Sequence, residues 1–263
     1  MGNSLAVVTG ASSGIGYELA RELAKRGYDL VIASAGERLE RAAQNFRTFN
    51  VQVTEVNADL ATQQGVDQLW QQITDRGQPV DIACINAGVG VGGHFTETDL
   101  AAELNMIALN CSGTVQLAKH VVQQMTPLRA GKILFTASIA GEMVAPREAV
   151  YAATKAFVLS FAHSLRYELK DTGITVTALQ PGPTDTDFFH RAGMDDTEVG
   201  QKGKSESQPE AVAKQGIEAL LAGKDHVYAA SLTTKLEGAM ANVIPGSVKA
   251  AMHDKMAKPV SEK

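Results

Sequence analysis

The feature that most constrains the fold is a regular alternation of short apolar runs with longer amphipathic stretches. Runs rich in Val, Ile and Ala recur up to about residue 230. This alternation is typical of βαβ units in a parallel sheet. Because the runs are continuously apolar, both faces of the sheet should be covered by helices. The expected strands span residues 5–9, 28–33, 51–57, 80–86, 131–137, 174–180 and 226–230.

The intervals between these runs indicate how the sheet is connected. Each interval is long enough for a right-handed crossover, and "GYELARELAKRG" and "GVDQLWQQITDRG" show helical periodicity with a glycine stop at Gly27 and Gly77. No linker-like stretch breaks the alternation. The sequence predicts an α/β fold: a single doubly wound Rossmann-type domain over residues 1–230, with a seven-stranded parallel sheet flanked by helices on both faces.

Two segments depart from this alternation. Residues 187–206 are polar, glycine-bearing and aperiodic, and we interpret them as a substrate lid. Ser207 and Glu210 then have the spacing of a capping box at the start of the next helix. Residues 231–263 are expected to form a C-terminal helical extension and tail, with apolar side chains at helical spacing at Leu232, Leu236, Met240 and Val243.

Composition excludes several classes of function. The net charge of −5 is spread without basic runs, which argues against nucleic acid and favours a small-molecule partner. The N-terminus lacks a charged leader with a cleavage site, and no apolar stretch is long enough to span a membrane, so we expect a cytoplasmic protein. Cys84 and Cys111 lack metal or disulfide spacing and are expected to be reduced, and the six histidines suggest no metal.

A glycine-rich segment directly follows the first expected strand. In "TGASSGIG", residues 9–16, Gly10, Gly14 and Gly16 allow a tight turn and a close backbone approach to a pyrophosphate at a helix N-terminus. A second stretch, "GVGVGG" at 88–93, matches the standard dinucleotide string literally. Mostly polar or turn-like residues follow it, so no helix N-terminus faces its glycines. We interpret 88–93 as a flexible loop.

The stretch "VYAATKAF", residues 150–157, places Tyr151 and Lys155 four residues apart at the start of an expected helix. That spacing puts both side chains on one helical face. By itself the pair fits an aromatic side chain in the core beside a lysine that reaches water. Its meaning therefore depends on the rest of the chain.

"TGASSGIG" at the start, "INAG" at 85–88, "YAATK" and "LQPGPTDT" at 179–186 occur in this order, and with them the sequence resembles the short-chain dehydrogenase/reductase family over residues 5 to about 230. One departure is Ile85, where the family often has an asparagine. The resemblance implies an NAD(P)-dependent oxidoreductase in which Tyr151 is the general acid or base. The other catalytic residues that it implies are Asn110, Ser138 and Lys155. From the residues alone, Ser138 could simply end a strand and Asn110 could bond a neighbouring carbonyl.

The expected cofactor contacts come from the glycine loop, the ends of the strands and the turn that holds the carboxamide. Asp59 could equally be a helix cap. The full predicted set is Gly10, Ser12, Ser13, Gly14, Ile15, Gly16, Ser34, Arg38, Asp59, Leu60, Asn86, Ala87, Gly88, Tyr151, Lys155, Pro181, Gly182, Thr184 and Thr186.

The chemistry expected from the resemblance is hydride transfer with proton transfer by Tyr151. A phenol with a pKa near 10 is about three units too weak an acid to serve as a base at neutral pH. Lys155 is expected to lower that pKa, Ser138 to bond the substrate oxygen, and Asn110 to hold a water for proton resupply.

At the end of the second strand stand Ala33, Ser34 and Ala35 in place of the acid expected of an NAD enzyme. Ser34 could donate to a 2′-phosphate and Arg38 could pair with it, which favours NADP(H) over NAD(H). The basic residue that NADP-dependent enzymes often have directly after the strand is missing. Arg38 could instead be only a solvent-exposed residue of the next helix.

The substrate should lie among residues 89–95, 139–144 and 187–206. The apolar members of these segments, Val91, Phe95, Met143, Val144, Phe188 and Phe189, favour an apolar carbonyl or secondary alcohol, whereas His94, Glu142 and Arg147 would favour a polar one. Rival functions are a non-catalytic cofactor-binding regulatory protein, and an epimerase or dehydratase that recycles its nicotinamide. The resemblance also implies a homodimer or homotetramer through the helices that begin near residues 98 and 150.

Overall fold

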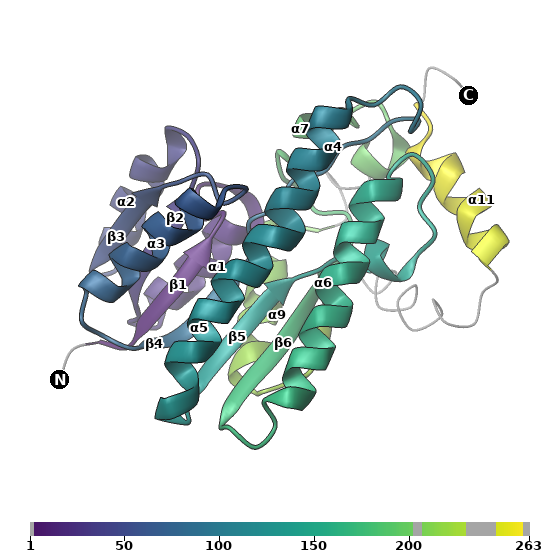
Figure 1. The fold of residues 1–263 in the computed structure, drawn as a ribbon. Coiled ribbons are helices and arrows are strands. Elements are labelled where there is room, and N and C mark those ends of the chain that lie inside the picture. The colour runs from purple at the N-terminus through teal and green to yellow at the C-terminus, as the bar shows by residue number, and fades with distance from the viewer. Residues whose placement is uncertain (1–2, 202–206, 230–245, 260–263) are drawn as a thin grey trace.

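The computed structural model describes residues 3–201, 207–229 and 246–259. Its centre is one parallel sheet of seven strands in the order β3-β2-β1-β4-β5-β6-β7, which confirms the predicted fold (Figure 1). The order reverses beside β1, as in doubly wound folds, so the chain builds outward in both directions from β1 and β4. The strands are β1 Leu5–Thr9, β2 Asp29–Ser34, β3 Val53–Asn57, β4 Val80–Ile85, β5 Gly131–Thr136, β6 Ile174–Pro181 and β7 His226–Ala229.

Helices cover both faces of this sheet (Figure 1). One layer contains α3, α4, α5 and α6, and the other contains α1, α2 and α9. The helices are α1 Gly14–Lys25, α2 Arg38–Arg47, α3 Gln63–Asp75, α4 Leu100–Ile107, α5 Thr114–Leu128, α6 Ala149–Glu168, α7 Phe188–Arg191, α9 Pro209–Leu221 and α11 Gly246–Ala257.

Each strand contributes alternate side chains to two separate cores. In β1, Leu5 and Val7 face the core beneath α3, α5 and α6, whereas Ala6 and Val8 face the core beneath α1, α2 and α9. All four side chains are at most 1% exposed. Burial on both faces is the physical reason that the strands read as continuous apolar runs.

The long middle helix contains an irregular turn. Between α4 and α5, residues Ala108–Gly113 form the π-helical segment η1. A Cβ atom at Gly113 would lie 2.1 Å from the carbonyl oxygen of Leu60, so only glycine lets the loop after β3 approach the helix here. Such π-helical turns often mark functional sites, and this one contains Asn110.

One local prediction needs correction. The capping box is wrong, because α9 begins at Pro209 after Gln208, with no side-chain cap. Ser207 is buried and its carbonyl accepts from Asp185 N, while Glu210 forms an ion pair with Arg21 of α1.

The segment after β6, interpreted from the sequence as a substrate lid, contains α7 and a buried cluster of Ala192, Met194 and Val199.

At the C-terminal end, helix α11 packs against that cluster through Ala257 and Met256 (Figure 1). The predicted apolar positions Leu232, Leu236, Met240 and Val243 lie outside the described residues. No helix within the three described ranges is both long and apolar enough to cross a membrane.

Candidate active site

A cavity of about 310 Å³ lies at the carboxyl ends of the strands. Parallel strands end together at this edge, which is where open α/β sheets bind their ligands. With two exceptions, Asn110 and Arg38, the predicted catalytic and cofactor-binding residues line it. Those that do are Gly10, Ser12, Ser13, Gly14, Ile15, Gly16, Ser34, Asp59, Leu60, Asn86, Ala87, Gly88, Ser138, Tyr151, Lys155, Pro181, Gly182, Thr184 and Thr186.

The loop between β1 and α1 has the backbone that its glycines predict. Gly10 and Gly14 have φ of 70° and 58°, a region that favours glycine. A Cβ at Gly16 would lie 2.2 Å from the carbonyl oxygen of Gly10. The N-cap residue Ser13 makes no side-chain hydrogen bond to the first turn of α1, so the N-terminal N–H groups remain for a ligand.

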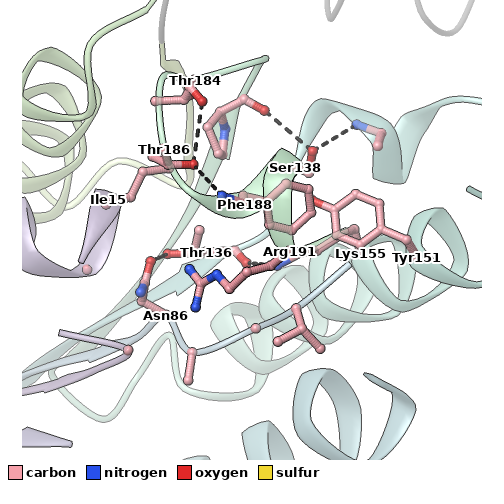
Figure 2. A pocket seen from close by; sticks show the side chains of 18 of the residues that line it. Ile15, Asn86, Thr136, Ser138, Tyr151, Lys155, Thr184, Thr186, Phe188 and Arg191 are labelled. Atoms are coloured by element: carbon pink, nitrogen blue, oxygen red, sulfur yellow. Dashed lines mark hydrogen bonds between the residues drawn. The ribbon is translucent and has the colours of Figure 1, made fainter. Parts of the chain in front are cut away.

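Asn86 at the end of β4 fixes this loop to the centre of the sheet. Its Nδ2 donates to the carbonyl oxygen of Thr9 (3.0 Å), and its Oδ1 accepts from the hydroxyl of Thr136 (2.9 Å). The hydroxyl of Thr9 accepts in turn from the backbone N–H groups of Asn86 and Ala87. Asn86 therefore both lines the cavity and holds the ends of β1, β4 and β5 in place (Figure 2).

At the end of β2, Ser34 and Ala35 form the cavity wall. The hydroxyl groups of Ser34 and Ser12 lie 2.9 Å apart, which brings the strand end and the glycine loop together. Arg38 does not line the cavity. Its guanidinium forms an ion pair with Asp187, at the start of the segment that contains α7.

Asp59 follows β3 and lines the cavity, with its side chain exposed. Its Oδ1 accepts from the N–H of Ala61 (3.0 Å). The alternative interpretation of Asp59 as the helix cap is wrong, because Thr62 caps α3 by accepting from Gly65 N. On the other side of the cavity, Thr186 packs over Gly14, since a Cβ at that glycine would meet its methyl group at 3.0 Å.

Tyr151 and Lys155 lie in the first two turns of α6 and face the cavity together with Ser138 (Figure 2). The ammonium group of Lys155 lies 5.8 Å from the centre of the Tyr151 ring and donates to the carbonyl oxygen of Thr136 (2.9 Å). Both side chains are more than nine-tenths buried. The structure thus brings the three residues to one wall of the cavity, rather than leaving Lys155 in water.

Burial controls the protonation of this group. The pKa of Tyr151 is raised well above 10, first because the phenol is buried and second because of the negative charge of Glu148, while the hydroxyl of Ser138 acts in the opposite direction. In this structure the net shift of the Tyr151 pKa is therefore upward, because burial outweighs the lowering expected from Lys155. Burial also lowers the pKa of Lys155 to about 8, and the nearby Cys111 opposes that shift.

Asn110 in η1 is buried behind the cavity wall. Its Oδ1 accepts from the backbone N–H of Val89, and its Nδ2 donates to the carbonyl of Val89 and to the hydroxyl of Thr154, each at 3.0 Å. A Cβ at Gly88 would lie 3.1 Å from Asn110 Oδ1 and 3.4 Å from Lys155 Nζ. In this structure Asn110 holds the loop after β4, as the simpler sequence interpretation suggested.

The glycines of "GVGVGG" make room for the segment after β6. A Cβ at Gly90 would lie 2.4 Å from the tip of the Phe188 ring, and one at Gly92 would lie 2.3 Å from Met194 Cγ. The N–H of Gly92 also donates to the carbonyl of Ala192 (2.9 Å). The predicted flexible loop is instead packed against residues 188–194.

The substrate end of the cavity is mainly apolar. Met143, Phe188 and Phe189 line it as predicted, and the Phe188 ring lies 5.2 Å from that of Tyr151 (Figure 2). The other predicted substrate-site residues do not line it: Val91, Phe95, Val144, His94, Glu142 and Arg147. Phe95 is 67% exposed, whereas Glu142 binds the side chains of Gln180 and Tyr228.

Sequence analysis missed several residues of this cavity. Glu148 lies just before α6, Arg191 is the last residue of α7, and His253 and Met256 come from α11. Glu148 stands three residues before Tyr151, a spacing that places it near the same helical face. The sequence around His253, "AAMHDK", has no periodic pattern that would have identified it.

The residues at the glycine-loop end fit a dinucleotide. The loop and the uncapped N-terminus of α1 line one continuous cavity that also reaches Ser34 and Tyr151. Within the described residues, His, Cys and acidic side chains form no cluster of three that could hold a metal ion. Cys84 and Cys111 are free thiols, which agrees with the sequence prediction.

Comparison with known proteins points the same way. Residues 4–197 match the family model of the short chain dehydrogenases. An uncharacterized oxidoreductase of Staphylococcus epidermidis is 32% identical over 205 residues, 78% of this chain and 86% of that protein. The 1-deoxy-11-beta-hydroxypentalenate dehydrogenase of Streptomyces exfoliatus is 36% identical over 69% of this chain and 67% of its own length.

Among solved structures, the chain is similar to a short-chain dehydrogenase from Sphingobium yanoikuyae in complex with NADPH. The TM-score is 0.79 at 28% identity, over 86% of this chain and 87% of that one.

Proposed function

Because this chain belongs to the short-chain dehydrogenase/reductase family, whose members are oxidoreductases that act with a nicotinamide cofactor, we propose that it transfers a hydride between NADP(H) and a carbonyl or secondary alcohol. The observation that carries this proposal is the meeting of Tyr151, Lys155 and Ser138 on one wall of a cavity that is continuous with the glycine loop. The Streptomyces exfoliatus relative, named as the dehydrogenase of a hydroxylated compound, supports the same chemistry.

A bound nicotinamide supplies or accepts the hydride. Tyr151 donates its proton to the substrate oxygen in reduction and takes it back in oxidation. Its raised pKa keeps it protonated at neutral pH, which suits its role as the acid in reduction. Ser138 orients the substrate oxygen by hydrogen bonding, and the ammonium of Lys155 stabilises negative charge on the phenol oxygen. Asn110 positions the loop after β4 and, as the family resemblance implies, holds a water for proton resupply.

The first test replaces Tyr151 by Phe. We expect NADPH to bind with unchanged affinity, because the ring and its packing against Phe188 are kept. Turnover should fall by about a hundredfold or more, because the proton donor is lost. Binding is measured by quenching of protein fluorescence, and turnover by NADPH absorbance over a panel of aldehydes, ketones and secondary alcohols. The matched control is Tyr167→Phe, at an exposed tyrosine later in α6.

Two other functions give different results in this test. A cofactor-binding regulatory protein would bind NADPH and turn over no substrate. An epimerase or dehydratase that recycles its nicotinamide would form product without a net change in NADPH absorbance. Unchanged turnover in Tyr151→Phe with an accepted substrate would refute the proposed mechanism.

The preference for NADPH rests on the end of β2. Ser34 and Ala35 form the wall there, and Arg38 begins the next helix within reach of Asp187. A 2′-phosphate carries a greater charge than Asp187 and would compete for the guanidinium. We expect kcat/KM for NADPH to exceed that for NADH. Arg38→Ala should reduce this ratio about tenfold, whereas Arg41→Ala, on the exposed side of the same helix, should not. A higher kcat/KM for NADH in the unmodified protein would contradict the preference.

Homo-oligomerisation through α4 and α6 belongs to the same proposal. Leu100, Leu104 and Ile107 lie along one face of α4 and are 65%, 55% and 39% exposed, and Phe157 of the neighbouring α6 is 42% exposed. An apolar stripe of this kind across two packed helices suits contact with a second copy.

A further inference from the structure

The cavity contains a buried histidine–glutamate pair, and the proposed chemistry gives its histidine no role. Nε2 of His253 in α11 lies 2.8 Å from Oε2 of Glu148, just before α6. The two side chains are 4% and 5% exposed, and both line the cavity. Around them the wall is apolar, formed by Met143, Phe188, Phe189, Val199 and Met256.

The second ring nitrogen of His253 has no hydrogen-bond partner among the described residues. Its Nδ1 is buried and accepts or donates no hydrogen bond within the described part of the chain. A buried polar atom without a partner costs free energy, so such an atom in a ligand cavity points to a bond that the ligand completes. Because His253 is among the residues that line the cavity, the group that completes this bond can come from a substrate bound there.

The position of the pair relative to Tyr151 makes this a substrate contact. Glu148 precedes Tyr151 by three residues, so the two side chains start from adjacent positions on one helical turn. Ser138, Tyr151 and Lys155 serve the reacting carbonyl in the proposed function, whereas Arg191 is exposed and its Nε donates to the carbonyl of Asp187 (3.4 Å). His253 and Glu148 form the buried polar pair of this cavity that can recognise a second polar group of the substrate.

The hydrogen-bonding chemistry selects the kind of group. The carboxylate of Glu148 accepts, so Nε2 of His253 carries the proton that it donates. Nδ1 is then an acceptor when the ring is neutral and a donor when the ring is charged. A hydroxyl group can serve as donor or acceptor and fits both states.

Resting on the function proposed above, we propose that His253, held by Glu148, is a specificity-determining residue that binds a hydroxyl group of an otherwise apolar carbonyl substrate. The substrate is then a hydroxyketone or hydroxyaldehyde, or the corresponding diol. An apolar pocket with a few fixed polar groups obtains its specificity from those groups in this way.

Contacts with neighbouring segments hold α11, and with it His253, in place. Next to the pair, Nε of Arg147 donates to Oδ1 of Asp254 (3.1 Å), which gives α11 a second contact with the loop before α6. Ala257 and Met256 pack against the segment that contains α7, and Thr197 and Pro259 form an isolated bridge. His253 is thus held on a docked element, at the same end of the molecule as α7 (Figure 1).

The test compares monohydroxylated 2-alkanones, with the hydroxyl three to eight carbons from the carbonyl, with their unsubstituted parent ketones. In the unmodified protein, at least one hydroxyketone should have a kcat/KM about tenfold higher than its parent, mainly through a lower KM. The variant His253→Gln can keep the bond to Glu148 through its amide nitrogen but has no atom at Nδ1. We expect this variant to lose the tenfold preference, so the ratio of kcat/KM for the hydroxyketone to that for its parent ketone should fall to about one.

Two controls separate substrate recognition from docking of α11. Asp254→Asn weakens the neighbouring contact with Arg147 and should keep the preference for the hydroxyketone. Thermal unfolding of both variants reports whether the fold is intact, and a second substitution, His253→Phe, must also abolish the preference. If the protein reduces parent ketones but prefers no hydroxyketone, this inference is overturned and the proposed function is not affected. A protein that reduces no carbonyl compound with NADPH would overturn the proposed function as well.

Discussion

At the scale of single residues, burial and charge compete at the Tyr151–Lys155 pair. The pair was recognisable from its spacing and from the family motif, but the direction of the pKa shift was not. Burial favours the neutral forms of both groups, so it raises the pKa of Tyr151 and lowers that of Lys155 to about 8. The same burial lowers the local dielectric constant, so a charge on either group interacts more strongly with neighbouring charges and dipoles.

The lowered pKa of Lys155 gives a pH prediction with a definite sign. Lys155 is charged below about pH 8 and loses its proton as the pH rises through that value. Because kcat/KM reports groups of the free enzyme, kcat/KM for NADPH in the reduction direction should fall above pH 8. A Lys155→Arg variant keeps its charge and, although slower, should show no such fall. A profile of the unmodified protein that is level up to pH 10 would contradict the assignment.

At the scale of elements, glycines decide which segments can approach one another. Gly16 lets α1 begin against the backbone of Gly10, whereas Gly90 and Gly92 let the segment with α7 lie on the loop after β4. The sequence contains both glycine clusters. The first cluster can be identified from the sequence as a cofactor loop because a helix follows it. The packing of the second cluster against residues about a hundred positions later could not be predicted from the sequence.

Two matched substitutions should separate these roles. Gly16→Ala places a methyl group against a backbone carbonyl and should raise KM for NADPH by about tenfold or more, with a lower Tm. Gly90→Ala displaces the Phe188 ring and should raise KM for the carbonyl substrate about fivefold, while KM for NADPH changes less than about twofold. Steady-state kinetics with each substrate varied in turn measures both. An equal rise of both KM values in Gly90→Ala would show that the loop after β4 serves the cofactor end instead.

At the scale of the whole molecule, the parallel sheet between two helix layers places the carboxyl end of every strand at one edge. This arrangement also leaves the apolar face of α4 exposed next to α6. In the predicted oligomer this face is buried between copies, so a charge on it should separate them.

Leu104→Glu tests that arrangement. We expect the variant to have the mass of a single chain by light scattering, whereas the unmodified protein has at least twice that mass, because a buried unpaired carboxylate opposes association. Leu221→Glu, at a half-exposed leucine of α9 in the opposite layer, should leave the mass unchanged. A Leu104→Glu protein with the mass of the unmodified one would exclude α4 from the interface.

The sequence alone determined the seven strands, the parallel sheet and nearly all of the cofactor end of the cavity. These features depend on local patterns: continuous apolar runs, glycines before a helix, and a tyrosine and a lysine one turn apart. Strand boundaries differ from the predicted ones by at most two residues. The family resemblance added Ser138 and most of the cofactor contacts outside the glycine loop, such as Asp59, Asn86 and Pro181, and these residues line the same cavity.

Tertiary structure decided the rest of the substrate end and the partner of Arg38 near the cofactor end. Arg38 and Asp187 are paired across 149 residues, and His253 reaches Glu148 across 105. Whether Phe95 or Phe188 faces the cavity depends on how the loop after β4 packs against α7. Contacts of this kind produce no periodic pattern in the sequence, because the two residues are far apart along the chain and become neighbours only when it folds.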